Sequence, residues 1–179
     1  MNAVTVLGAF PKPVAPALTS LDLEVVPIDL LTEWRRCGMV ADFMAEYMVH
    51  AFERRDVARS ILSTVTNELV ENAAKFSAEK RAVAHVSIRH HGDVVHAEVR
   101  NEADEAHVQH LRELLADLAR SGAIAVFQRR LEGRRGLGLA MLAKDYGATV
   151  GATIEPNGAE GRNTICLRVS LSALEVEQR

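Results

Sequence analysis

Three polar residues in one predicted helix have the types and the spacing of a chemical site. Glu68, Asn72 and Lys75 follow one another at intervals of four and three residues, which places them along one side of a helix. A carboxylate there can accept a proton, a carboxamide oxygen can hold Mg²⁺, and an ammonium group can contact phosphate. A solvated helix edge with ordinary ion pairs has the same spacing, so this pattern alone leaves both interpretations open.

A glycine-rich segment, Gly136-Leu137-Gly138-Leu139, opens another predicted helix. Glycine lets the backbone approach a ligand closely, and the free amides at a helix start favour an anion. The segment is not a dinucleotide-binding motif, because no predicted strand precedes it and Met141 stands at the third glycine position. Arg135, directly before it, can neutralise a phosphate, meet an acidic partner or lie on a solvated face. By itself the segment fits a phosphate site or an ordinary helix entry.

Apolar residues recur at helical spacing in the stretches that must position these groups. The stretch with the three polar residues is predicted as a helix from about Val57 to Ser77, with Asp56 as its N-cap. The glycine-rich segment leads into a helix that ends at Tyr146, before a C-capping Gly147. The other predicted helical stretches are Leu31–Phe52, Asp104–Arg120 and Ile124–Leu131.

Strict alternation of apolar and polar residues indicates two β-hairpins, each with one buried face. The paired segments are Ala84–Arg89 with Val95–Arg100, and Ala148–Ile154 with Ile165–Leu171. Short strands are also expected at Val4–Phe10 and Leu21–Val26. This order predicts an α+β fold, a two-layer α/β sandwich with a mixed, largely antiparallel sheet and helices on one face. Residues 1–20 are expected to form an N-terminal arm, and residues 21–175 a single domain.

The composition excludes several classes of protein. The chain has 179 residues and a formal net charge of −3, which argues against nucleic-acid binding through bulk positive charge. Its aromatic residues are too few for a stacking platform on single strands. No apolar stretch approaches the roughly 18 residues that span a bilayer, so no membrane partner is expected. Cys37 and Cys166 form neither a disulfide framework nor a metal quartet, so the expected location is the cytoplasm.

Taken together, the two polar features resemble motifs of the GHKL superfamily, the ATPase domains shared by gyrase B, sensor histidine kinases and anti-sigma factor serine kinases. The run from Asn67 to Phe76, NELVENAAKF, resembles the N-box of this family, and Gly136–Leu139 resembles its second glycine box. A hairpin and helical segments lie between them, in the family's order. The resemblance covers about residues 56–171 and implies the family's Bergerat-type sandwich, with ATP held between helices and sheet.

The resemblance also implies a role for each matching residue. Asn72 is expected to coordinate the Mg²⁺ that bridges the phosphates of ATP, and Glu68 is expected to act as general base. Lys75 is expected near the phosphates, and the amides of Gly136–Leu139 are expected to cradle them. The first glycine box departs from the family, because Asn101 stands in place of an adenine-binding Asp and both glycines are missing. Asn101 can accept one hydrogen bond from adenine, without the charge assistance that a carboxylate gives.

The resemblance further implies a regulatory protein. A free-standing domain of this size resembles the anti-sigma factor serine kinases, which act by partner switching and phosphorylate a Ser or Thr of a small STAS-type antagonist protein. Two functions therefore compete. One is a protein Ser/Thr kinase that depends on ATP and Mg²⁺, and the other is a pseudokinase that binds partners with weak or no nucleotide binding. A small independent ATP hydrolase is a third alternative, and a homodimer is left open.

Overall fold

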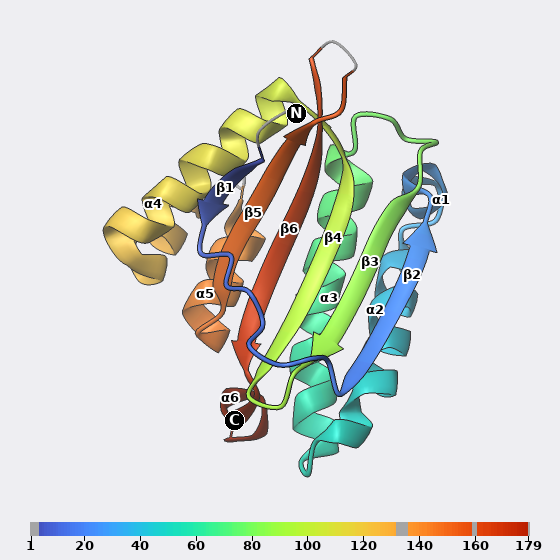
Figure 1. Ribbon diagram of the computed structural model, residues 1–179, viewed down its shortest axis with the longest axis vertical. Helices are drawn as coiled ribbons and strands as arrows, with labels where there is room; N and C mark the ends of the chain where they lie inside the picture. The colour runs from blue at the N-terminus through green and yellow to red at the C-terminus, as the bar shows by residue number, and fades with distance from the viewer. Residues whose placement is uncertain (1–3, 132–135, 159–160, 179) are drawn as a thin grey trace.

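A single antiparallel sheet forms the centre of the computed structural model, which describes residues 4–131, 136–158 and 161–178. Its six strands are ordered β1-β5-β6-β4-β3-β2 (Figure 1). The strands are β1 Thr5–Gly8, β2 Thr19–Val25, β3 Ala84–His90, β4 Val94–Asp104, β5 Thr149–Pro156 and β6 Arg162–Ser172. Every described pairing is antiparallel, so the sheet is not mixed as predicted, whereas the predicted α+β sandwich is confirmed.

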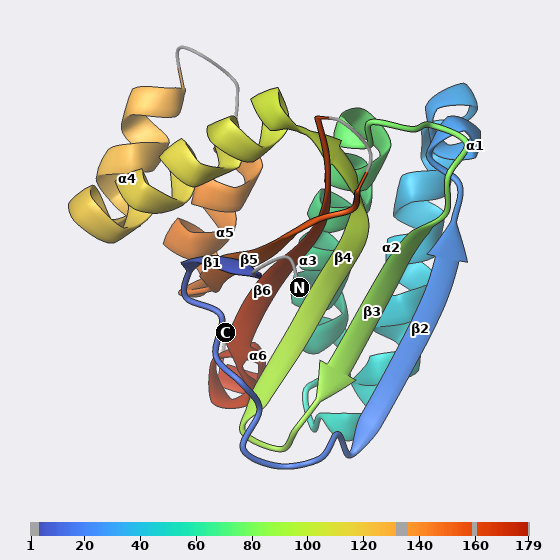
Figure 2. The same cartoon turned by 45° about the horizontal axis from the view of Figure 1, so that its top comes forward.

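The main helices cover one face of this sheet. Figures 1 and 2 show α2, α3 and α5 behind the strands, with α4 along the β1 edge. The helices are α1 Pro27–Thr32, α2 Arg35–Met48, the 3-10 helix η1 Val49–Ala51, α3 Arg55–Phe76, α4 Glu105–Arg130, α5 Leu137–Tyr146 and α6 Ala173–Gln178. None of these described helices is both long and apolar enough to cross a membrane. Since α3 contacts both α2 and α5, its polar residues can face either neighbour.

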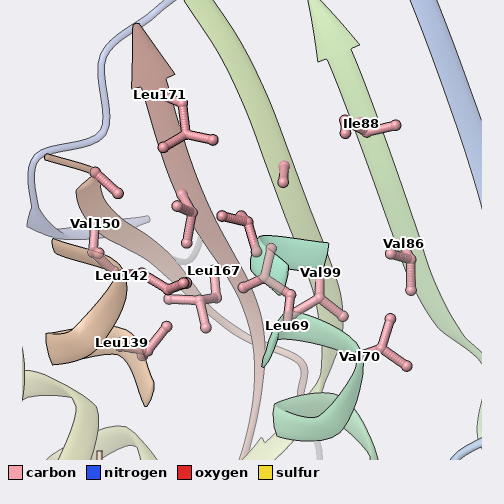
Figure 3. Close-up of a cluster of buried hydrophobic side chains, with 14 of the residues drawn as sticks. Leu69, Val70, Val86, Ile88, Val99, Leu139, Leu142, Val150, Leu167 and Leu171 are labelled. Carbon is pink, nitrogen blue, oxygen red and sulfur yellow. The ribbon is translucent and has the colours of Figure 1, made fainter. Parts of the chain in front are cut away.

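The hydrophobic core fixes α3 and α5 against the same strands. Figure 3 gathers Leu69 of α3, Val99 of β4, Leu142 of α5 and Leu167 of β6 in one buried cluster. Burying a side chain of this size stabilises the fold by about 1.5–3 kcal/mol. Because the two helices share this core, the polar residues at their common edge keep a fixed separation.

The N-terminal residues contact the sheet in two ways. β1 pairs with β5, and Gly8 lies opposite Gly151 in the register. The chain then crosses the sheet face that carries no helices (Figure 1), where the guanidinium carbon of Arg168 lies 3.8 Å from the centre of the Phe10 ring. Farther along, Nδ1 of His91 lies 2.8 Å from the backbone oxygen of Ala15. The stretch predicted as an arm is therefore packed along the sheet.

Two helix starts differ from the prediction. The predicted helix Leu31–Phe52 is divided at Glu33, whose backbone angles are not helical, so that α1 and α2 each bury their own apolar face. At the start of α3 the N-cap position is held by Arg54, which makes no side-chain capping hydrogen bond. Asp56, the predicted cap, lies instead in the first turn, where its charge favours the helix dipole.

The two helical stretches predicted after the first hairpin are both present and are joined within α4. α4 runs from Glu105 to Arg130 and is kinked at Gly122, whose φ of 75° only glycine adopts easily. Asp104 caps this helix, because its Oδ1 accepts a hydrogen bond of 2.7 Å from the backbone amide of His107. β4 continues to Asp104, so strand and helix meet directly at this residue.

Candidate functional site

The side chains of Glu68 and Asn72 form a hydrogen-bonded pair on α3. Nδ2 of Asn72 donates to Oε1 of Glu68 at 3.0 Å and to the backbone oxygen of Glu68 at 2.7 Å. Burial raises the pKa of the Glu68 carboxyl, and the hydrogen bond from Asn72 and the charge of Lys75 oppose this rise only in part. A carboxylate with a raised pKa and a neutral amide as its hydrogen-bond partner is suited to accept a proton.

The start of α5 lies directly against the Glu68 carboxylate. A Cβ atom at Gly138 would lie 2.0 Å from both Cδ and Oε1 of Glu68, so a side chain here would displace the carboxylate. The helix begins after Gly136, whose φ of 68° lies in the left-handed region that favours glycine. The first amides of a helix have no intrahelical acceptor and favour anions. Glu68, Asn72 and the Gly136–Leu139 segment are thus brought together.

Lys75 belongs to a different polar row on α3. Its Nζ lies 2.7 Å from Oε2 of Glu71. The same ammonium lies 5.0 Å from the centre of the Trp34 ring, at the connection between α1 and α2. The predicted trio is therefore divided: Glu68 and Asn72 pair beside α5, whereas Lys75 turns toward α1 and α2.

A pocket of about 440 Å³ opens beside Lys75, between the C-terminal end of α3 and the first turns of α4. One wall is formed by Phe76 and His107, whose rings stack with centroids 4.5 Å apart and planes 9° apart. Burial lowers the pKa of His107 to about 4, so its imidazole is neutral at pH 7. Lys80 also lines the pocket, and its Nζ donates to the backbone oxygens of Ala74 and Lys75. Asp104 also lines the pocket, so a flat aromatic wall lies beside two ammonium groups and one carboxylate, a lining that suits a polar aromatic ligand.

Asn101 lies on the helix-facing side of β4. It is buried, with 9% of its surface exposed, on the strand face that also carries Val99. Its Nδ2 donates a hydrogen bond of 2.9 Å to the backbone oxygen of Glu102, which leaves the carboxamide oxygen as an acceptor. The lining of the pocket beside Lys75 does not include Asn101, so the two features are separate. Arg135 lies outside the described residues.

The donor atoms between α3 and α5 suit a hard cation that also contacts phosphate. Asn72 uses its Nδ2 for both hydrogen bonds, so its carboxamide oxygen is the atom that can ligate Mg²⁺. Glu68 places a carboxylate oxygen beside it. Within the described residues, no group of three or more His, Cys, Asp or Glu side chains is placed to hold a metal ion. Mg²⁺ commonly keeps one or two protein ligands and completes its shell with phosphate and water, which fits this pair.

The part of the chain that carries this site matches a known protein family. The model of the family described as histidine kinase-, DNA gyrase B-, and HSP90-like ATPase matches residues 58–173, a stretch that includes Glu68, Asn72 and Gly138. The chain belongs to this family. The superfamily expected from the N-box and glycine-box motifs is therefore confirmed. Glu68, Asn72 and the start of α5 lie within the matched part of an ATPase domain.

A solved structure shows the same fold. A chain of the SiaB–SiaC complex from Pseudomonas aeruginosa is similar to this member of the ATPase family with a TM-score of 0.65 and 19% sequence identity. The similarity covers 87% of this chain and 91% of that chain. A search of curated proteins finds no match.

Two ring contacts beside this site of the ATPase family could not be predicted from the sequence. The contact of Trp34 with Lys75 joins the α1–α2 connection to α3, and the stack of Phe76 with His107 joins α3 to α4. Neither pair has a spacing that a helical or strand period would reveal. The one available signal was the position of Phe76, directly after Lys75 at the end of the N-box run.

Proposed function

We propose that this chain is a regulatory protein kinase that transfers the terminal phosphoryl group of Mg²⁺-ATP to a Ser or Thr of a STAS-type partner protein. The observation that carries the proposal is the position of the Glu68 carboxylate, between the Asn72 amide and the first turn of α5. Membership of the ATPase family supports the use of ATP. The SiaB–SiaC neighbour, which was solved with a second protein, supports a role in partner binding.

Each group of the site has one task in the proposed reaction. Asn72 holds Mg²⁺ through its carboxamide oxygen, and the amides at the start of α5 bind phosphate oxygens. When bound, Mg²⁺ supplies neutralisation of the phosphate charge. Glu68 accepts the proton of the incoming hydroxyl group, a task for which its raised pKa suits it. The protein therefore contributes mainly positioning and charge, as phosphoryl transfer requires.

The length of α3 supports this arrangement. At about 1.5 Å of rise per residue, Glu68 and Lys75 lie roughly 10 Å apart along the helix axis. The pocket with Phe76 and His107 lies at the Lys75 end, and the start of α5 lies at the Glu68 end. A nucleotide with its base against the stack of Phe76 and His107 would place its first phosphate beside Lys75 at the pocket rim and direct its terminal phosphate along α3 toward Glu68.

A second candidate function is a partner-binding pseudokinase. It is favoured by the part of the site where the adenine base of a nucleotide would bind. Asn101 carries no charge, and its Nδ2 is already bound to the backbone of Glu102. The ring of His107 covers one face of Phe76, so a base entering there would have to displace it or stack outside it. Both features lower the affinity expected for a nucleotide, and the same surfaces remain available to a protein partner.

Incubation with Mg²⁺-ATP and a STAS-domain protein, followed by intact-mass measurement, tests the proposed kinase. We expect transfer by the wild type and by Glu24→Gln, an exposed control on β2 with the same change of carboxylate to amide. We expect a large loss of transfer in Glu68→Gln. Transfer that is unchanged in Glu68→Gln would contradict the proposed base, whereas partner binding without any transfer would favour the pseudokinase.

A further inference from the structure

Trp34 stands at the corner where the chain turns from α1 into α2. It is the single tryptophan of the chain, and 39% of its surface is exposed. An exposed tryptophan is unusual, because its ring has more apolar surface to bury than any other side chain. The face of this ring is directed at α3, where the Nζ of Lys75 lies 5.0 Å from the ring centre. This distance is within the range of a cation–π contact.

Lys75 is therefore held by two contacts. The Glu71 carboxylate lies 2.7 Å from Nζ, and the centre of the Trp34 ring lies 5.0 Å from it. The Lys75 side chain is nearly half exposed and lines the pocket at the end of α3. A free lysine side chain samples many rotamers, and these two contacts offset the entropy that is lost when the ammonium is kept at this rim.

The corner itself is fixed to α3 by separate contacts. The backbone amide of Ile28 donates to the backbone oxygen of Lys80 at 2.8 Å, which ties α1 to the segment after α3. Within the corner, Nη1 of Arg36 donates to the backbone oxygen of Asp29 at 3.1 Å. The ring of Trp34 is thus carried by a rigid support.

A ring and a carboxylate hold an ammonium group with different consequences. Glu71 alone would neutralise the charge of Lys75 and turn it away from a phosphate. The aromatic face attracts the cation through its quadrupole and adds no negative charge. The ring can therefore hold the ammonium at the pocket rim without adding to the neutralisation of its charge by Glu71, which lies 2.7 Å away.

We propose that Trp34 is a positioning residue that holds the Lys75 ammonium at the pocket rim, where it contacts the phosphates of a bound nucleotide. The proposal rests on the proposed function, since it needs a nucleotide in the site between α3, α4 and α5. It assigns a role in ATP recognition to the α1–α2 corner, which lies outside the stretch matched by the ATPase family. Any partner that covers this corner would also change the position of Lys75.

The test compares the affinities of ATP and adenosine, because only ATP carries the phosphates that Lys75 would contact. We expect Trp34→Leu to weaken ATP binding about three-fold, as loss of an exposed cation–π contact does, and to leave adenosine binding unchanged. Trp34→Phe keeps an aromatic face and is expected to restore most of the ATP affinity. Tyr47→Leu, a matched change of an exposed aromatic residue on α2, is expected to have no effect on either ligand.

A second set of variants, made in a Lys75→Met chain, separates a positioning role of Trp34 from a general effect on folding. In Lys75→Met, a further Trp34→Leu change is expected to cause no additional loss of ATP affinity, because the cation is already gone. Equal loss for ATP and adenosine in Trp34→Leu, or an additional loss in the Lys75→Met background, would overturn the positioning role. ATP binding that Trp34→Leu leaves unchanged would overturn this inference alone. A wild type that binds no nucleotide would overturn the proposed function together with it.

Discussion

Glu68 and Glu71 are both glutamates of α3, three residues apart, yet their surroundings differ. Glu71 is an ion-pair partner of Lys75 at 2.7 Å, so a full positive charge balances it. Glu68 contacts Gly138 and accepts a hydrogen bond from the neutral Asn72 amide, and burial raises its pKa. The element packed beside each glutamate, and not the motif alone, therefore sets its surroundings, and in the proposed function this makes Glu68 the base.

The elements packed against the two sides of α3 explain why the surroundings of Glu68 and Glu71 differ. On the Glu68 side, α5 presents a glycine, so the carboxylate loses water without gaining a cation. On the Glu71 side, the α1–α2 corner presents the Trp34 ring, which holds Lys75 in place beside Glu71. In the proposed function, one row of α3 therefore serves proton transfer, and the other holds Lys75 for binding negative charge.

The largest expected effect separates the two glutamates in catalysis. Glu68→Gln is expected to slow phosphoryl transfer by about 100-fold or more, because a general base typically contributes that much. Glu71→Gln is expected to slow it far less, since it changes only the surroundings of Lys75. Single-turnover rates at saturating ATP measure both. Equal losses in the two variants would remove the distinction between the two rows.

A smaller effect is expected for the two asparagines that pair with these glutamates. Asn72→Ala is expected to weaken Mg²⁺-dependent ATP binding by at least about ten-fold, a typical result of disturbing a metal site. Asn67, whose Nδ2 donates to Oε1 of Glu71 at 3.0 Å, offers a matched control on the other row. Asn67→Ala is expected to change this affinity little in calorimetric titrations. A loss in Asn67→Ala as large as that in Asn72→Ala would contradict the assignment of the cation to Asn72.

Two glycines allow a comparison of packing. A Cβ atom at Gly151 would lie 2.1 Å from the backbone oxygen of Ala9, so Gly151→Ala is expected to lower the free energy of unfolding by about 1–3 kcal/mol. At Gly138 the clash is with the end of the flexible Glu68 side chain, so Gly138→Ala is expected to cost less than about 1 kcal/mol. It should nevertheless slow phosphoryl transfer, because the carboxylate must move. Chemical denaturation together with transfer rates would test this, and a Gly138→Ala variant with full transfer activity would contradict it.

The smallest expected effect concerns pH. Because burial raises the pKa of Glu68, the folded chain binds this proton more tightly than the unfolded chain does. The resulting stabilisation is complete below the unfolded pKa and is lost as pH rises through the raised folded pKa. The stability of Glu68→Gln relative to the wild type should therefore increase as pH rises above about 4, the ordinary pKa of a glutamate. Denaturation curves at a series of pH values measure the increase, and a stability difference that does not change with pH would contradict it.

The elements that carry the site could be predicted because their signals are local. The apolar period from Val57 to Ser77 predicted α3, which runs from Arg55 to Phe76. Gly147 correctly marked the end of α5, where it takes a φ of 62°. Alternation predicted both hairpins. The pairing of Glu68 with Asn72 follows from their i,i+4 spacing alone.

The remaining features depend on packing between distant segments. The contact of Glu68 with Gly138 requires the shared core that holds α3 against α5, and no pattern within either helix encodes it. The backbone of Glu33 is not helical, yet no glycine or proline stands between residues 31 and 36 to mark the break in the sequence. The direction of the Lys75 side chain is set by Glu71 and Trp34, and a long flexible side chain has no preferred partner in the sequence.

The proposed function requires that α3 and the start of α5 form a site for ATP with Mg²⁺. Calorimetric titration of the wild-type chain with ATP, once with Mg²⁺ and once with a chelator, tests it most directly. We expect saturable binding at one site, weakened strongly when the chelator removes Mg²⁺. Absence of binding, or binding of equal strength under both conditions, would contradict it.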